Sequence, residues 1–119
     1  MSNITESLET LIKVDGAMCS ALVDSSSGMV LGTAGSGLDL DVAAAGNTEV
    51  VRAKLNTIKA LGLSDSIDDI LITLTGQYHI IRPLEKSPEV FIYLVLDRAK
   101  ANLALARLQV KKSDEQLVL

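Results

Sequence analysis

Apolar residues recur along the chain with two different periods, and these periods predict where its helices and strands lie. A helical spacing of three or four residues is found first at Ile4, Leu8, Leu11 and Ile12. Ser2 or Asn3 is positioned to cap this first helix. A much longer helix is expected to begin at a cap on Asp39 or Asp41 and to end at Gly62.

Five shorter apolar stretches have the length of strands, and they occupy residues 17–23, 29–31, 67–75, 78–82 and 90–96. The first two flank a turn rich in Ser and Gly and are expected to form a hairpin. The last is apolar at every position, so it should lie at the centre of the sheet with both faces covered. A flexible glycine-rich joint is predicted at residues 32–37, and a last helix is expected after a cap at Asp97. The expected order α-β-β-α-β-β-β-α is an α+β fold, with one five-stranded antiparallel sheet and helices on both faces.

The long helix is predicted to present three different faces, because successive residues of an α-helix are about 100° apart. The face expected to pack on the sheet consists of Ala44, Val51, Leu55 and Ile58. A second face, of small and apolar residues, consists of Ala43, Gly46, Val50, Ala53, Thr57 and Leu61. Small side chains let another helix approach closely, so a partner helix is favoured there over contact with a neighbouring loop. The third face is polar and consists of Glu49, Arg52, Asn56 and Lys59.

The composition indicates one domain with more apolar surface than a monomer can bury. The chain has 119 residues, of which 48% are hydrophobic, and it is expected to form a single domain over residues 1–119 with a frayed tail at 113–119. Its mean hydropathy of +0.33 is high for so small a domain. We therefore expect an oligomer or a permanent partner.

The same composition argues against several classes of protein. A net charge of −4 without a basic block argues against nucleic-acid binding. The longest apolar run, residues 90–96, is far shorter than a membrane span, so no membrane insertion is expected. The first residues lack the pattern of a signal peptide, and a single cysteine fits the reducing cytoplasm. One His and one Cys argue against a metal site of the usual ligands, and no cofactor is expected.

Few residues suggest chemistry, and no catalytic residue is predicted. The glycine-rich joint precedes a helix but lacks the Lys-Ser/Thr ending of a phosphate-binding loop. His79 has neither an orienting acid nor a nucleophile that can be named, so a packing or surface role is favoured. Arg52 could act as an arginine finger on a partner's phosphoryl group, but pairing with Glu49 is favoured. The charges of the adjacent Asp68 and Asp69 are expected to blunt an edge strand, which means that they discourage its pairing with a strand of another molecule.

Two parts of the sequence resemble the Roadblock, or dynein light chain, family. In the first part, residues 15–24, DGAMCSALVD, and residues 28–31, GMVL, resemble the first hairpin of that family. Bacterial members that occur with small Ras-like GTPases are similar to residues 76–84, GQYHIIRPL, and residues 93–107, YLVLDRAKANLALAR. The order of elements matches along nearly the whole chain.

The resemblance implies a profilin-like Roadblock arrangement, with the long helix on one face of the sheet and the two terminal helices on the other. It also implies a homodimer in which the third strands pair antiparallel and the long helices lie side by side. The second face of the long helix would then form the helix seam. The strand seam would consist of Asp69, Ile70, Leu71, Ile72, Thr73, Leu74 and Thr75.

The function expected from the residues and the resemblance together is that of a non-enzymatic, cytoplasmic homodimeric adaptor. It would bind a Ras-like small GTPase through the polar face of the long helix and modulate or scaffold the GTPase cycle. Two alternatives remain: an assembly adaptor that ignores the nucleotide state, and a sensory domain for a small ligand. The low aromatic content, 3%, speaks against the sensory domain.

Overall fold

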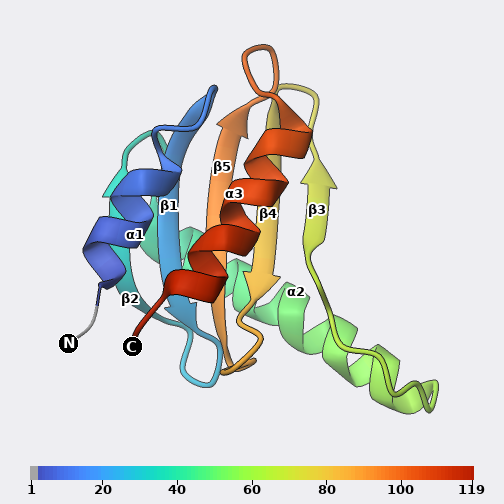
Figure 1. The fold of residues 1–119 in the computed structure, drawn as a ribbon. Coiled ribbons are helices and arrows are strands. Elements are labelled where there is room, and N and C mark those ends of the chain that lie inside the picture. The colour runs from blue at the N-terminus through green and yellow to red at the C-terminus, as the bar shows by residue number, and fades with distance from the viewer. Residues whose placement is uncertain (1–2) are drawn as a thin grey trace.

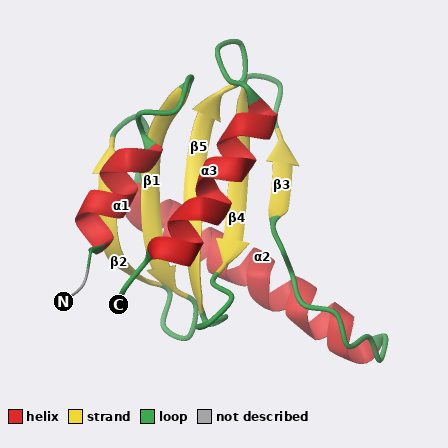
Figure 2. Cartoon of the chain, viewed as in Figure 1, coloured by secondary structure: helices red, strands yellow, loops and turns green. Residues whose placement is uncertain are grey.

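The computed structural model describes residues 3–119, and the described part contains three helices and five strands (Figures 1 and 2). In chain order these are α1 (Ile4–Leu11), β1 (Ala17–Asp24), β2 (Met29–Gly35), α2 (Leu40–Ala60), β3 (Ile70–Thr73), β4 (Gln77–Pro83), β5 (Val90–Asp97) and α3 (Leu103–Gln116). The order is the predicted one.

The five strands form one antiparallel sheet in the order β2-β1-β5-β4-β3. Strand β5 lies at its centre and is buried along almost its whole length, as its unbroken apolar sequence predicts. Helices α1 and α3 cover one face of the sheet and α2 crosses the other (Figure 2). The predicted fold class is therefore confirmed.

Alternate residues of β5 point to opposite faces and supply the centre of two separate cores. The core beneath α1 and α3 contains Ile92, Leu94 and Leu96. The core beneath α2 contains Phe91, Tyr93 and Val95, and these pack with buried residues of β1 and α2. A sheet with both faces covered leaves the edges β2 and β3 as the places where more chain can be added.

The glycine-rich segment after the first hairpin is mostly strand, so the prediction of a flexible joint at 32–37 is wrong. Strand β2 continues to Gly35, which pairs with Cys19 of β1. Gly35 has a φ of 76°, and a Cβ there would collide with the carbonyl oxygen of Met18. The glycine is needed so that β2 can approach β1, and only the short stretch after it remains to join α2.

The predicted helix ends are partly confirmed. Asp39 caps α2, because its carboxylate accepts hydrogen bonds from the amides of Asp41 and Val42. Asp97 does not cap α3, since its side chain binds the amide of Ala99 within a turn. The cap is Asn102, whose side-chain oxygen accepts from the amide of Leu105.

The first and last residues of the described chain contact each other. Asn3 occupies the cap position of α1, but its amide nitrogen donates to the carbonyl of Gln116 and its oxygen accepts from the amide of Val118. Residues 113–116, expected to fray, form the last turn of α3, in which Ser113 and Asp114 are buried. Ser2, the other predicted cap, lies outside the described residues.

Candidate partner-binding surface

Helix α2 forms the candidate surface because the sheet covers only part of it. Ala44, Thr48 and Val51, which lie in the first twelve of its 21 residues, are buried. Further along, Leu55 is 39% exposed and Leu61 is 65% exposed. Figure 1 shows the C-terminal part of α2 projecting beyond the sheet edge at β3.

The face predicted to pack on the sheet therefore does so only in part. Ala44 and Val51 are buried as expected, whereas Leu55 is exposed and Ile58 is only half-buried. The reason is length. A helix of 21 residues is about 31 Å long, whereas five strands spaced about 4.8 Å apart span about 19 Å. The apolar residues of the overhanging part consequently lack a cover within their own chain.

The small-residue face of α2 is open, and it borders the predicted strand seam. Of its members Ala43 is half-buried and the other five are exposed. A groove of about 540 Å³ runs between α2 and the start of β3, and it is lined by Val50, Ala53, Lys54, Thr57, Asp69 and Ile70. Five of these six residues were predicted to lie at a dimer seam, from two segments well apart in the sequence. The structure places both segments along one groove.

Strand β3 is an edge strand, paired with β4 on one side only in the described chain. It is shorter than the predicted strand 67–75 because only Ile70–Thr73 joins the ladder with β4. Ile70, Leu71 and Ile72 are half-buried, and Leu74 beyond the strand is 42% exposed. An edge strand that is apolar and not blunted by charge is suited to pair with another strand.

Asp69 does not blunt that edge, contrary to the prediction, because its carboxylate is bound to α3. Both of its oxygens accept from Arg107, at 2.8 Å from Nε and 3.0 Å from Nη2. This hydrogen bond and the negative charge raise the pKa of Arg107. The ion pair ties the start of β3 to α3 on the face of the sheet opposite α2.

The polar face of α2 is exposed, but Arg52 also makes contacts that sequence reasoning missed. Glu49, Asn56 and Lys59 are exposed. Arg52 pairs with Glu49 at 3.4 Å, as predicted, but it also donates to the carbonyl oxygens of Ser25 at 2.7 Å and Ser26 at 3.0 Å. Arg52 thus connects α2 to the turn between β1 and β2, a packing role in addition to the predicted pairing with Glu49.

A row of polar side chains lies between α2 and the sheet, and no sequence signal pointed to it. The Nδ1 atom of His79 is 2.9 Å from the hydroxyl of Tyr93, and its Nε2 atom is 2.8 Å from Oε1 of Gln77. The amide oxygen of Gln77 can only accept, so the neutral ring donates from Nε2 and accepts at Nδ1. Gln77 in turn donates to the sulfur of Met18, at 3.8 Å. His79 is therefore a packing residue with both ring nitrogens bound.

Burial sets the protonation of this region. It lowers the pKa of His79, raises the pKa of Tyr93 and raises the pKa of Cys19, whose side chain is inaccessible. All three groups are consequently held neutral at pH 7. Within residues 3–119 there is no group of three His, Cys, Asp or Glu side chains that could hold a metal ion.

Solved structures similar to this chain share its fold across nearly its whole length. The structure of MglB from Myxococcus xanthus superposes with a TM-score of 0.82 at 21% identity, covering 94% of this chain and 89% of the other. A Roadblock/LC7 domain from Streptomyces avermitilis superposes with a TM-score of 0.82 at 12% identity, covering 96% and 93%. The gliding protein MglB from Thermus thermophilus superposes with a TM-score of 0.78 at 23% identity, covering 92% and 82%.

Sequence comparison adds no relative to these structures. No protein-family model and no curated protein sequence matches the chain. Across residues 3–119 no helix is both long enough and apolar enough to cross a membrane.

Proposed function

We propose, on the premise that this chain has the Roadblock/LC7 fold, that two copies form a homodimer that serves as a non-enzymatic adaptor for a Ras-like small GTPase. The observation that carries the proposal is the groove between α2 and β3. It brings an unpaired strand edge and an open face of small side chains together on one side of the molecule. A second copy can cover both at once, whereas a loop of the same chain covers neither in the described structure.

The proposed dimer pairs β3 with β3 of the second copy and places the two α2 helices side by side. Main-chain hydrogen bonds would extend the sheet across the two copies, and the small residues of α2 would allow close helix contact. The overhanging part of α2, with Leu55 and Leu61 exposed, would gain a cover from the second copy. One similar solved structure is described as MglB with a tetrameric arrangement, which supports oligomer formation on this fold.

The dimer is tested by sedimentation of the wild type and of two matched variants. Ala53→Glu places a charge in the groove, whereas Ala45→Glu places the same charge on an exposed position of the polar face of α2. We expect the wild type and Ala45→Glu to have about twice the mass of 12.6 kDa, and Ala53→Glu to be a folded monomer. A dimeric Ala53→Glu would contradict the groove as the interface.

The GTPase is proposed to bind the exposed polar residues of the two α2 helices, namely Glu49, Arg52, Asn56 and Lys59. In the dimer two such sets lie close together and offer a surface of the size of a standard interface, about 800 Å² per side. The support is the exposure of these side chains together with the resemblance to bacterial Roadblock members. Any effect on GTP hydrolysis is then exerted by ordering the GTPase's own switch loops.

This contact is tested by binding Ras-like GTPases from the same genome, each loaded with GDP or with a non-hydrolysable GTP analogue. We expect the GTP form to bind more tightly and the double variant Asn56→Ala/Lys59→Ala to weaken binding at least about fivefold. Lys112→Ala, an exposed lysine on the opposite face of the sheet, is the control and should bind normally. Equal binding of both nucleotide states would favour an assembly adaptor, and normal binding by the double variant would place the contact elsewhere.

A further inference from the structure

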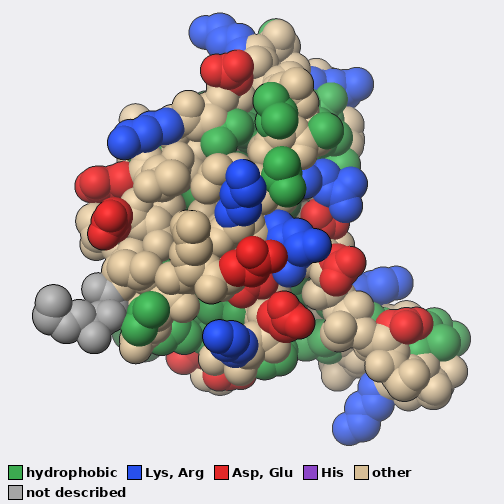
Figure 3. Space-filling model, in the orientation of Figure 1, with side chains coloured by type: hydrophobic (Ala, Val, Ile, Leu, Met, Phe, Trp, Pro, Cys, Tyr) green, Lys and Arg blue, Asp and Glu red, His purple; other side chains and the backbone are tan. Residues whose placement is uncertain are grey.

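The segment of residues 98–113, on the face of the molecule opposite α2, carries a concentration of positive charge. Residues 98–113 contain five of the eleven Lys and Arg residues and no Asp or Glu, in a chain whose net charge is −4. All five are exposed, and they are Arg98, Lys100, Arg107, Lys111 and Lys112. Figure 3 shows blue side chains gathered over α3 beside green hydrophobic ones.

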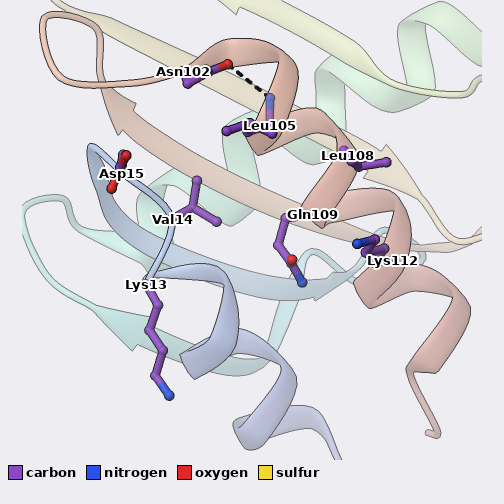
Figure 4. Close-up of a pocket in the computed structure, with 8 residues that line it drawn as sticks. All are labelled: Lys13, Val14, Asp15, Asn102, Leu105, Leu108, Gln109 and Lys112. Carbon is purple, nitrogen blue, oxygen red and sulfur yellow. Dashed lines mark hydrogen bonds between the residues drawn. The ribbon is translucent and has the colours of Figure 1, made fainter.

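Two large apolar side chains are exposed within this basic segment. Leu105 is 56% exposed and Leu108 is 49% exposed, one helical turn apart on α3. Both line a groove of about 270 Å³ between α3 and the turn that joins α1 to β1. Figure 4 shows Val14 of that turn and Leu105 extending towards each other, while the side chain of Lys13 extends away. The groove offers room for an apolar side chain from outside the chain.

The lysines beside these leucines are available for contact with another molecule. Lys111 and Lys112 follow Leu108 by three and four residues, so they lie on the same side of α3. Arg107 is bound to Asp69, but neither lysine forms an ion pair within residues 3–119. The exposed side of α3 thus combines two leucines with two lysines that form no ion pair within residues 3–119, and the exposed Glu115 follows them in the same helix.

We propose that this side of α3, with its groove, is a second docking surface that binds an acidic segment of a partner protein. A large apolar side chain of the segment would enter the groove beside Leu105 and Leu108, and its carboxylates would contact Lys111 and Lys112. The positive charge of the two lysines favours an acidic partner, whereas the two exposed leucines alone would fit any apolar partner. A flat anionic membrane is disfavoured, because red acidic side chains border the blue ones on the same face (Figure 3). The surface is on the far side of the sheet from α2, so an adaptor could hold two partners at once.

The probe for this surface is a phage-displayed library of random 12-residue peptides, selected on the full chain. Clones that also bind the double variant Lys111→Glu/Lys112→Glu are removed. We expect the remaining peptides to be rich in Asp and Glu around one or two large apolar residues. In solution Lys111→Glu/Lys112→Glu should weaken their binding at least about tenfold and Leu105→Ser at least about fivefold. Lys59→Glu on α2 is the control and should leave binding unchanged.

Three outcomes would overturn the proposal. One is that no peptide remains after the subtraction, and a second is that the remaining peptides are neutral or basic. The third is that phosphatidylserine vesicles bind the wild type but not the lysine variant and displace the selected peptides, while these peptides bind too weakly to displace the vesicles, which would assign the surface to a membrane. Circular dichroism of each variant confirms that the fold is intact, which is expected because the substituted side chains are exposed.

Discussion

Arg52→Ala is predicted to destabilise the protein, although Arg52 lies on an exposed polar face. Its guanidinium donates to the carbonyl oxygens of Ser25 and Ser26, which belong to the turn between β1 and β2. Truncation to alanine leaves both carbonyls without this partner. It also releases the turn from α2, the helix on which we place both the dimer seam and the GTPase contact.

The magnitude follows from the contacts and the exposure. A hydrogen bond from a charged donor contributes roughly 1.5–3 kcal/mol when it is buried. The Arg52 side chain is 46% exposed and its pair with Glu49 is more exposed still, so water replaces much of what is lost. We therefore expect a loss of about 1–2 kcal/mol in the free energy of unfolding. With an unfolding entropy of about 2.1 cal/mol/K per residue, a chain of 119 residues should melt about 4–8 °C lower.

The assay is thermal and urea unfolding of Arg52→Ala, with Lys59→Ala as the matched control. Lys59 lies on the same polar face and is exposed, so its loss should stay within about half a kcal/mol. All proteins are compared at one concentration, because the stability of a dimer depends on it. If Arg52→Ala were as stable as Lys59→Ala, the fastening of α2 to the turn would be refuted.

Three further predictions concern buried groups. Asp114→Ala should lower the free energy of unfolding, measured with urea, by about 3–5 kcal/mol, because the nearly buried Arg82 loses the carboxylate that lies 2.7 Å from its Nε. A loss below about 1 kcal/mol would contradict this ion pair. Burial depresses the pKa of His79 below 6.5, so its contribution to the free energy of unfolding should be fully present above pH 6.5 and be lost as the pH drops towards the lowered pKa. His79→Gln should flatten this pH dependence, and an unchanged slope of the free energy against pH would refute the assignment. Cys19 is inaccessible and its thiol pKa is raised, so a thiol reagent should modify it only as fast as the protein unfolds, whereas rapid labelling of the native protein would contradict its burial.

Much of the fold could be predicted because each element carries its own local signal. The strand period, the unbroken apolar run of β5 and the cap at Asp39 are properties of neighbouring residues. Two capping residues, Asp97 and Asn102, precede α3, and sequence alone could not choose between them. The choice depends on Asp97 closing a turn with the amide of Ala99.

The parts of the site that sequence reasoning missed depend on distances between elements. The partners of Arg52 are main-chain carbonyls more than twenty residues away, and a carbonyl has no signature in a sequence. The exposure of Leu55 follows from the width of the sheet relative to the length of α2. The polar row through His79 and Tyr93 requires the register of β4 against β5, which periodicity leaves open.

The central claim, that two copies join through β3 and α2, is tested most directly by a nitroxide label on β3. Thr73→Cys offers an exposed attachment site on that strand, while the native Cys19 is buried and stays unlabelled in the folded protein. Paired strands lie about 5 Å apart, so labels on two joined β3 strands should broaden each other's spectrum strongly. The broadening should vanish on dilution with unlabelled protein and in Ala53→Glu. A sharp spectrum from the fully labelled protein, at concentrations where sedimentation gives a dimer, would contradict the claim.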